Sequence, residues 1–80
     1  MGEVMKHATG MNSIQRKATE LLHEMWNANM PDFLSVGEAA SVCSDHGVDA
    51  PRWESQARKG SPEQVPLAKL AMFIAQRINR

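Results

Sequence analysis

The sequence predicts an all-α fold: a compact four-helix domain with a central helix-turn-helix and a mobile N-terminus. Three observations lead to this prediction. Apolar residues recur every three or four positions along most of the chain, which is typical of helices packed on one side. Residues that start and stop helices stand between these segments. No stretch alternates between apolar and polar residues for long enough to indicate a strand. Eighty residues are enough for one small domain.

The first helix is expected to follow a short leader. The opening stretch "MGEVMKHATG" has no clear periodicity, so we expect a flexible leader over residues 1–11 and a single helical domain over residues 12–80. Asn12 can cap the first helix, with Gln15 as its reciprocal partner. The apolar stripe of this helix consists of Ile14, Ala18, Leu21, Leu22 and Met25. The residues expected to end it are Asn27, Asn29 and Pro31.

The second helix is marked at both ends. Ser35 and Glu38 form an S-x-x-E capping box at its start. Gly47 supplies the left-handed residue that commonly follows a helix. The apolar stripe between them consists of Val36, Ala39, Ala40 and Cys43. Because these side chains are small, we expect another helix to approach closely.

Prolines and glycines delimit the last two helices. Asp49 is the expected cap of the third helix, Pro51 occupies its first turn, and Gly60 ends it. The fourth helix is expected to begin near Pro66, because the residue before a proline disfavours the helical conformation. Its apolar stripe consists of Leu67, Leu70, Ala71, Ile74 and Ile78.

The middle helices have the spacing of a helix-turn-helix. That motif needs a small residue in its first helix, a turn containing glycine, and an apolar anchor in its second helix. Cys43 lies four residues before Gly47, Val48 follows the glycine, and Trp53 lies five residues further on. We expect Trp53 to be the anchor.

The face of the third helix opposite Trp53 has the chemistry to contact DNA. Arginine can bond the edge of a guanine bidentately, serine can bond several bases, and basic residues at a helix end can hold phosphates. Residues 1–47 carry three basic and six acidic side chains, whereas residues 48–80 carry six basic and three acidic ones. The second part therefore suits an anionic partner. The expected DNA-binding residues are Arg52, Ser55, Arg58 and Lys59.

The stretch "CSDHGVDAPRW" resembles the helix-turn-helix of small transposase-encoded DNA-binding subunits. The layout of residues 35–78 is similar to that of phage regulators of the lambda activator type. It departs from their pattern in a longer helix before the glycine and in Gln56, where an apolar residue is common. The resemblance implies a sequence-specific regulator from a phage or mobile element that binds double-stranded DNA. Such proteins usually dimerise.

A second interpretation is a small helical module that binds a protein of the host, as an inhibitor or adaptor, and does not bind DNA. In the fourth helix, two large apolar side chains are expected to point away from the core stripe, which suggests a partner or dimer interface. The alternative is that the leader or the first helix covers them. The residues of this candidate interface are Lys69, Met72, Phe73 and Gln76.

Other classes of function find little support in the sequence. Cys43, His46, His23 and His7 lack the paired spacing of a zinc site. No glycine-rich phosphate loop or recognisable catalytic spacing is present, so we expect neither an enzyme nor a cofactor. A single cysteine fits a reducing cytoplasm, and no apolar run is long enough to cross a membrane.

Overall fold

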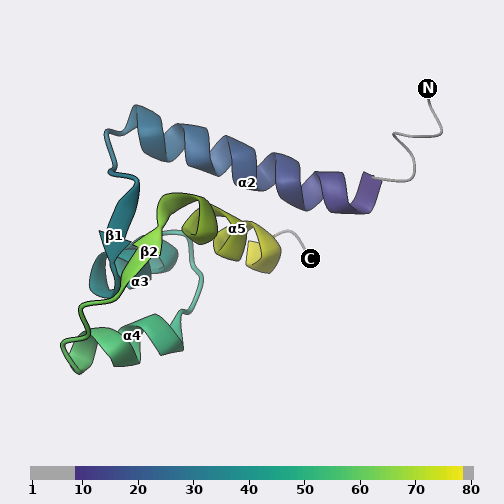
Figure 1. The fold of residues 1–80 in the computed structure, drawn as a ribbon. Helices are drawn as coiled ribbons and strands as arrows, with labels where there is room; N and C mark the ends of the chain where they lie inside the picture. The colour runs from purple at the N-terminus through teal and green to yellow at the C-terminus, as the bar shows by residue number, and fades with distance from the viewer. Residues whose placement is uncertain (1–8, 79–80) are drawn as a thin grey trace.

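The computed structural model describes residues 9–78 of the chain. Four helices and two short strands follow one another in this range: α2 (Thr9–Asn27), β1 (Phe33–Ser35), α3 (Val36–Asp45), α4 (Pro51–Arg58), β2 (Gln64–Pro66) and α5 (Leu67–Ile78). The fold is mostly helical, as predicted. Helix α2 runs along α5 and α3 packs on α4, so that α4 lies on the far side of the molecule from α2 (Figure 1).

The prediction of an all-α fold is wrong in one respect, because β1 and β2 form a two-stranded antiparallel sheet. The register pairs Phe33 with Pro66, Leu34 with Val65, and Ser35 with Gln64. The two central side chains, Leu34 and Val65, are buried and the others are exposed. Three residues are too few to show a recognisable alternation. The sheet ties the chain before α3 to the chain before α5.

Helix α2 begins earlier than predicted. It starts at Thr9, so residues 9–11 are helical rather than part of a leader, and Asn12 lies inside the helix instead of capping it. The remainder of the expected leader, residues 1–8, lies outside the described residues. The helix therefore extends beyond the first residue of its apolar stripe, because helix formation does not require an apolar side chain in every turn.

Helix α2 ends in a Schellman motif. Asn29 has a φ of 66°, in the left-handed region that asparagine tolerates better than most residues. The backbone N–H of Asn29 donates to the carbonyl of Trp26 at 2.9 Å, and that of Met30 donates to Met25 at 3.0 Å. These two bonds satisfy carbonyl groups that a helix end otherwise leaves without partners. Asn29 therefore ends the helix, as predicted.

The capping box at the start of α3 is confirmed. The backbone N–H of Glu38 donates to the Ser35 hydroxyl at 3.1 Å, and the backbone N–H of Ser35 donates to the Glu38 carboxylate at 3.1 Å. Two N–H groups at the helix start thereby obtain partners. The carboxylate also lies in the first turn, where its negative charge interacts favourably with the positive end of the helix dipole.

Replacing Ser35 with alanine is expected to cost about 1 kcal/mol of stability, since it removes the acceptor at the N-cap. In a domain of this size that corresponds to a fall of about 4–8 °C in melting temperature. Ser41→Ala is the matched control, because Ser41 is exposed in the middle of the same helix. Thermal denaturation of both variants tests this, and equal melting temperatures would show that the cap contributes nothing.

The core lies between α2 and α5 and continues under the sheet to α3 and α4. The buried residues of α5 are Leu67, Leu70, Ala71, Ile74 and Ala75, and those of α2 are Ala18, Leu21 and Met25. Ile78 does not belong to the core, contrary to prediction. It is the last residue of α5 and its side chain is 42 % exposed, so the buried stripe ends one turn earlier. None of the described helices is both long and apolar enough to cross a membrane.

Candidate nucleic-acid interface

A second Schellman motif forms the turn between α3 and α4. Gly47 has a φ of 72°. Its N–H donates to the carbonyl of Ser44 at 2.9 Å, and the N–H of Val48 donates to Cys43 at 2.8 Å. Val48 is buried in the core. The glycine and the apolar residue after it thus have the roles in the turn that the sequence predicts.

The small residues of α3 lie where this helix meets its neighbours. Ala39 and Cys43 have no exposed surface, and the other residues of the predicted stripe are also buried. On the side towards α4, a Cβ atom placed on Gly37 would lie 3.6 Å from the Cβ of Ala57. Close approach at this point holds α3 and α4 together, with Gly37 contributing in addition to the predicted residues.

Burial raises the pKa of the Cys43 thiol from 9.0 to about 11, despite the nearby positive charge of Arg77. Between these values the folded protein keeps a proton that the unfolded chain releases. Stability should therefore fall as the pH rises from about 9 towards 11. Urea denaturation of the wild type and of Cys43→Ala across this range tests the prediction. The difference between their pH slopes isolates the thiol, and parallel slopes would contradict it.

Helix α4 is anchored by Trp53 but is not capped as predicted. Pro51 is the first helical residue, so the N-cap falls on Ala50, which has no side chain to accept a hydrogen bond, and not on Asp49. Trp53 is buried and packs on Phe73 of α5, with the ring centroids 4.7 Å apart. The aromatic contact joins α4 to the rest of the core. A third positive-φ residue, Gly60, follows the helix.

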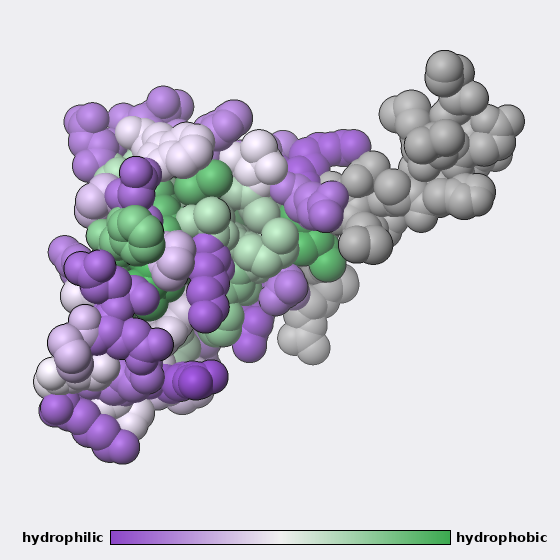
Figure 2. All heavy atoms as spheres, in the orientation of Figure 1, coloured by the Kyte–Doolittle hydropathy of each residue, from purple (hydrophilic) through white to green (hydrophobic). Residues whose placement is uncertain are grey.

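The predicted DNA-binding residues lie together on α4 and at its C-terminal end. Arg52, Arg58 and Lys59 are exposed, whereas Ser55 is partly buried. Lys59 is the C-cap, one residue beyond the helix. Side chains over α4 are hydrophilic, and the hydrophobic ones gather where α2 meets the strands and α5 (Figure 2). Glu54 is the acidic residue exposed in the first turn of α4.

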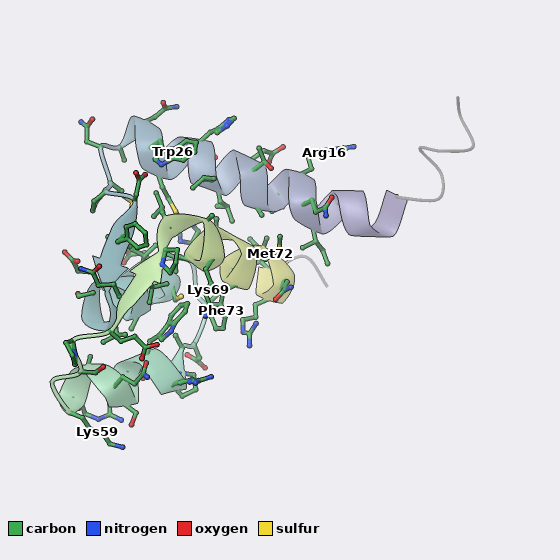
Figure 3. The ribbon with its side chains drawn as sticks, viewed as in Figure 1. Arg16, Trp26, Lys59, Lys69, Met72 and Phe73 are labelled. Atoms are coloured by element: carbon green, nitrogen blue, oxygen red, sulfur yellow. The ribbon has the colours of Figure 1, made fainter. Side chains whose placement is uncertain are left out.

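The residues predicted as a partner interface on α5 do not share one surface. Phe73 is partly buried and faces α4, against Trp53 (Figure 3). Met72 is also partly buried, but it faces α2, where it lines a shallow pocket with Leu22. Lys69 and Gln76 are exposed. The expectation that both apolar side chains are exposed is therefore wrong. The alternative, that the first helix covers them, holds for Met72, whereas α4 covers Phe73.

Sequence reasoning missed two exposed aromatic residues. Trp26 is 45 % exposed and Phe33 is 56 % exposed. The indole N–H of Trp26 donates to the Asp32 carboxylate at 3.2 Å, and the His23 ring stacks on the indole with centroids 5.8 Å apart. Trp26 directly follows Met25, a residue of the apolar stripe, and so lies off that stripe. This position was the signal in the sequence that Trp26 is exposed.

Within residues 9–78, no three His, Cys, Asp or Glu side chains are grouped so that they could hold a metal ion. His7, considered as a ligand above, lies outside the described residues. Comparison with known protein families, with characterised proteins and with solved structures finds no match to this chain. A proposal about its function therefore depends on the residues themselves.

Proposed function

We propose that this protein binds double-stranded DNA through the outer face of α4, as a regulator of the helix-turn-helix type. The observation that carries the proposal is the two-sided character of α4. Its inner side is fixed by the buried Trp53, while Arg52, Arg58 and Lys59 are exposed, with Arg52 at the edge of the helix that borders α5. A short helix held rigidly with cations on its free side has the properties required of a recognition helix.

The surroundings of α4 support the same proposal. Helix α3 packs on it, and the turn between them is fixed by the backbone bonds at Gly47 and Val48. Helix α2 lies on the opposite side of the molecule from α4 (Figure 1). Arg52 lies in the first turn, from which recognition helices contact base edges. Arg58 and Lys59 at the other end suit phosphate contacts.

The first experiment measures binding to random duplex DNA as a function of salt. Each phosphate contact contributes a slope of about −0.9 to the dependence of log K on log salt. Three contacts then predict a loss of affinity of about 40-fold between ~50 mM and ~200 mM salt. Absence of binding at the lower salt concentration would overturn the proposal.

The second experiment replaces Arg52, Ser55 and Lys59 with alanine. Helix formation should be retained, since alanine is a good helix former, while most of the DNA affinity should be lost. Arg52→Ala alone should relax base preference, whereas Lys59→Ala should weaken binding to all sequences and lower the salt slope by about one. The measurement is fluorescence anisotropy with labelled duplexes, alongside thermal melting.

The matched control for this variant is Arg16→Ala/Lys17→Ala on α2. It also removes two positive charges, and Arg16 is exposed far from α4 (Figure 3). If both variants lose the same affinity, the protein attracts DNA by overall charge and α4 has no special role. Undiminished binding by the α4 variant would contradict the proposal directly.

A second candidate function is binding of a protein partner without DNA, and the exposed Trp26 and Phe33 favour it. Exposed aromatic side chains are enriched where proteins meet. The two residues are connected through Asp32, which precedes Phe33 and accepts the indole hydrogen bond. A chain that fails to bind DNA at low salt would make this face, rather than α4, the region to study.

A further inference from the structure

A pocket of about 300 Å³ lies between α4 and α5. One wall is the start of α4, including Arg52 and Trp53. The other is a single face of α5, where Lys69, Phe73 and Arg77 follow one another at intervals of four residues. Lys69 and Phe73 lie on the side of α5 towards α4 (Figure 3). Helix geometry therefore places two cations on one face of α5, and the cation Arg52 of α4 borders the same space.

The pocket has an excess of positive charge. Three cations line it against one carboxylate, that of Glu63. This carboxylate accepts a hydrogen bond from the Gln56 amide at 2.8 Å. Within residues 9–78, Arg52, Lys69 and Arg77 have no carboxylate within ion-pairing distance. Three cations that border one concavity attract an anion to it.

The arrangement of the cations is partly fixed. The guanidinium carbon of Arg77 lies 3.7 Å from the centroid of the Phe73 ring, which in turn packs on Trp53. An arginine stacked on an aromatic ring retains its hydrogen-bond donors for a ligand and loses less conformational entropy on binding. Ala50 at the N-cap adds no side-chain acceptor at this end of the pocket.

We propose that this pocket binds a phosphate group, held by Arg52, Lys69 and Arg77. Arginines can bind phosphate oxygens bidentately, and lysine adds a point charge. The phosphate can belong to the backbone of a nucleic acid or to a small phosphate ester, because both present the same oxygens. The proposal goes beyond base recognition by α4: two of the three ligands are on α5, and phosphate binding here does not require DNA to be read.

The test uses Trp53 as the reporter. The chain has two tryptophans, so Trp26→Phe leaves the tryptophan that lines the pocket as the sole indole fluorophore. This protein is titrated with inorganic phosphate, with adenosine monophosphate and with duplex DNA, against sodium chloride at equal ionic strength. Saturable change in emission with either small phosphate identifies a free phosphate as ligand. Change with DNA alone identifies the backbone if replacing the α5 cations weakens it.

The decisive variant is Lys69→Gln/Arg77→Gln, made in the same background. If a small phosphate binds, we expect its affinity to fall at least tenfold. If DNA binds, we expect the slope of log K against log salt to be smaller by about two. Arg16→Gln/Lys17→Gln on α2 is the charge-matched control and should behave as the wild type. Both α5 cations are exposed, so their replacement should not disturb the core. If the double variant nevertheless melts at a lower temperature, Lys69→Gln alone takes its place. We expect this single variant to lose at least threefold in affinity.

Two results would overturn the phosphate pocket. One is that none of the three probes changes the emission by more than sodium chloride does. The other is equal affinity of the pocket variant and the α2 control in every titration. If DNA binds well but the pocket variant is unaffected, the phosphate pocket is wrong while binding through α4 stands. The two proposals therefore fail independently.

Discussion

Replacing Trp53 with alanine should cost about 3–5 kcal/mol, the usual range for removing a buried tryptophan. The indole is 9 % exposed, lies on the inner side of α4 and packs on Phe73. No other aromatic residue of the described chain makes the contact between these two helices. Domains of this size have a total stability of about 4–12 kcal/mol. The variant should therefore be marginally folded or unfolded, as measured by urea denaturation followed by circular dichroism.

The matched control is Trp26→Ala, which removes the same side chain from an exposed position. Trp26 loses one hydrogen bond to Asp32 and its stacking on His23, both at the surface. Its cost should be about 1 kcal/mol, because nearly half of the residue is exposed and both of these contacts lie at the surface. Similar losses at both positions would show that Trp53 is not the anchor of α4.

Local signals allowed much of the helical structure to be predicted from the sequence. The capping box at Ser35 and Glu38 and the turn at Gly47 each depend on residues a few positions apart. Such signals operate within one turn of the chain, so the sequence contains all that they need. The prediction of Asp49 as the N-cap of α4 was wrong, and the cause also lies in neighbouring residues. Pro51 takes the first helical position, and this places the N-cap on Ala50.

The strands could not be predicted because their stabilisation is not local. Leu34 pairs with Val65, thirty-one positions away, and each strand has only three residues. The residues that contact Phe73 could not be predicted from the sequence for the same reason. Its position off the apolar stripe of α5 was evident, but the presence of Trp53 beside it depends on how α4 packs. The pocket that collects cations from α4 and α5 also exists only in the folded chain.

The candidate site shows the same division. Arg52, Arg58 and Lys59 could be identified as an exposed basic face from the helix period alone, and the structure leaves all three exposed. Arg77 could not, because its importance arises from stacking on Phe73 and from facing Arg52 across the pocket. Charged residues on separate helices become one site only after packing. A sequence therefore indicates which helix face is basic more readily than which cations share a ligand.

Leu70→Ala should cost about 2–5 kcal/mol, because Leu70 has no exposed surface and its removal leaves a cavity between α5 and the rest of the core. Ile78→Ala on the same helix is the control. The sequence places both residues on one apolar stripe, but Ile78 is 42 % exposed, so its loss should cost about 1 kcal/mol or less. Urea denaturation of the two variants measures the difference. Equal costs would mean that the last turn of α5 is covered in solution, whereas a loss confined to Leu70 would establish that the buried face of α5 ends at Ala75.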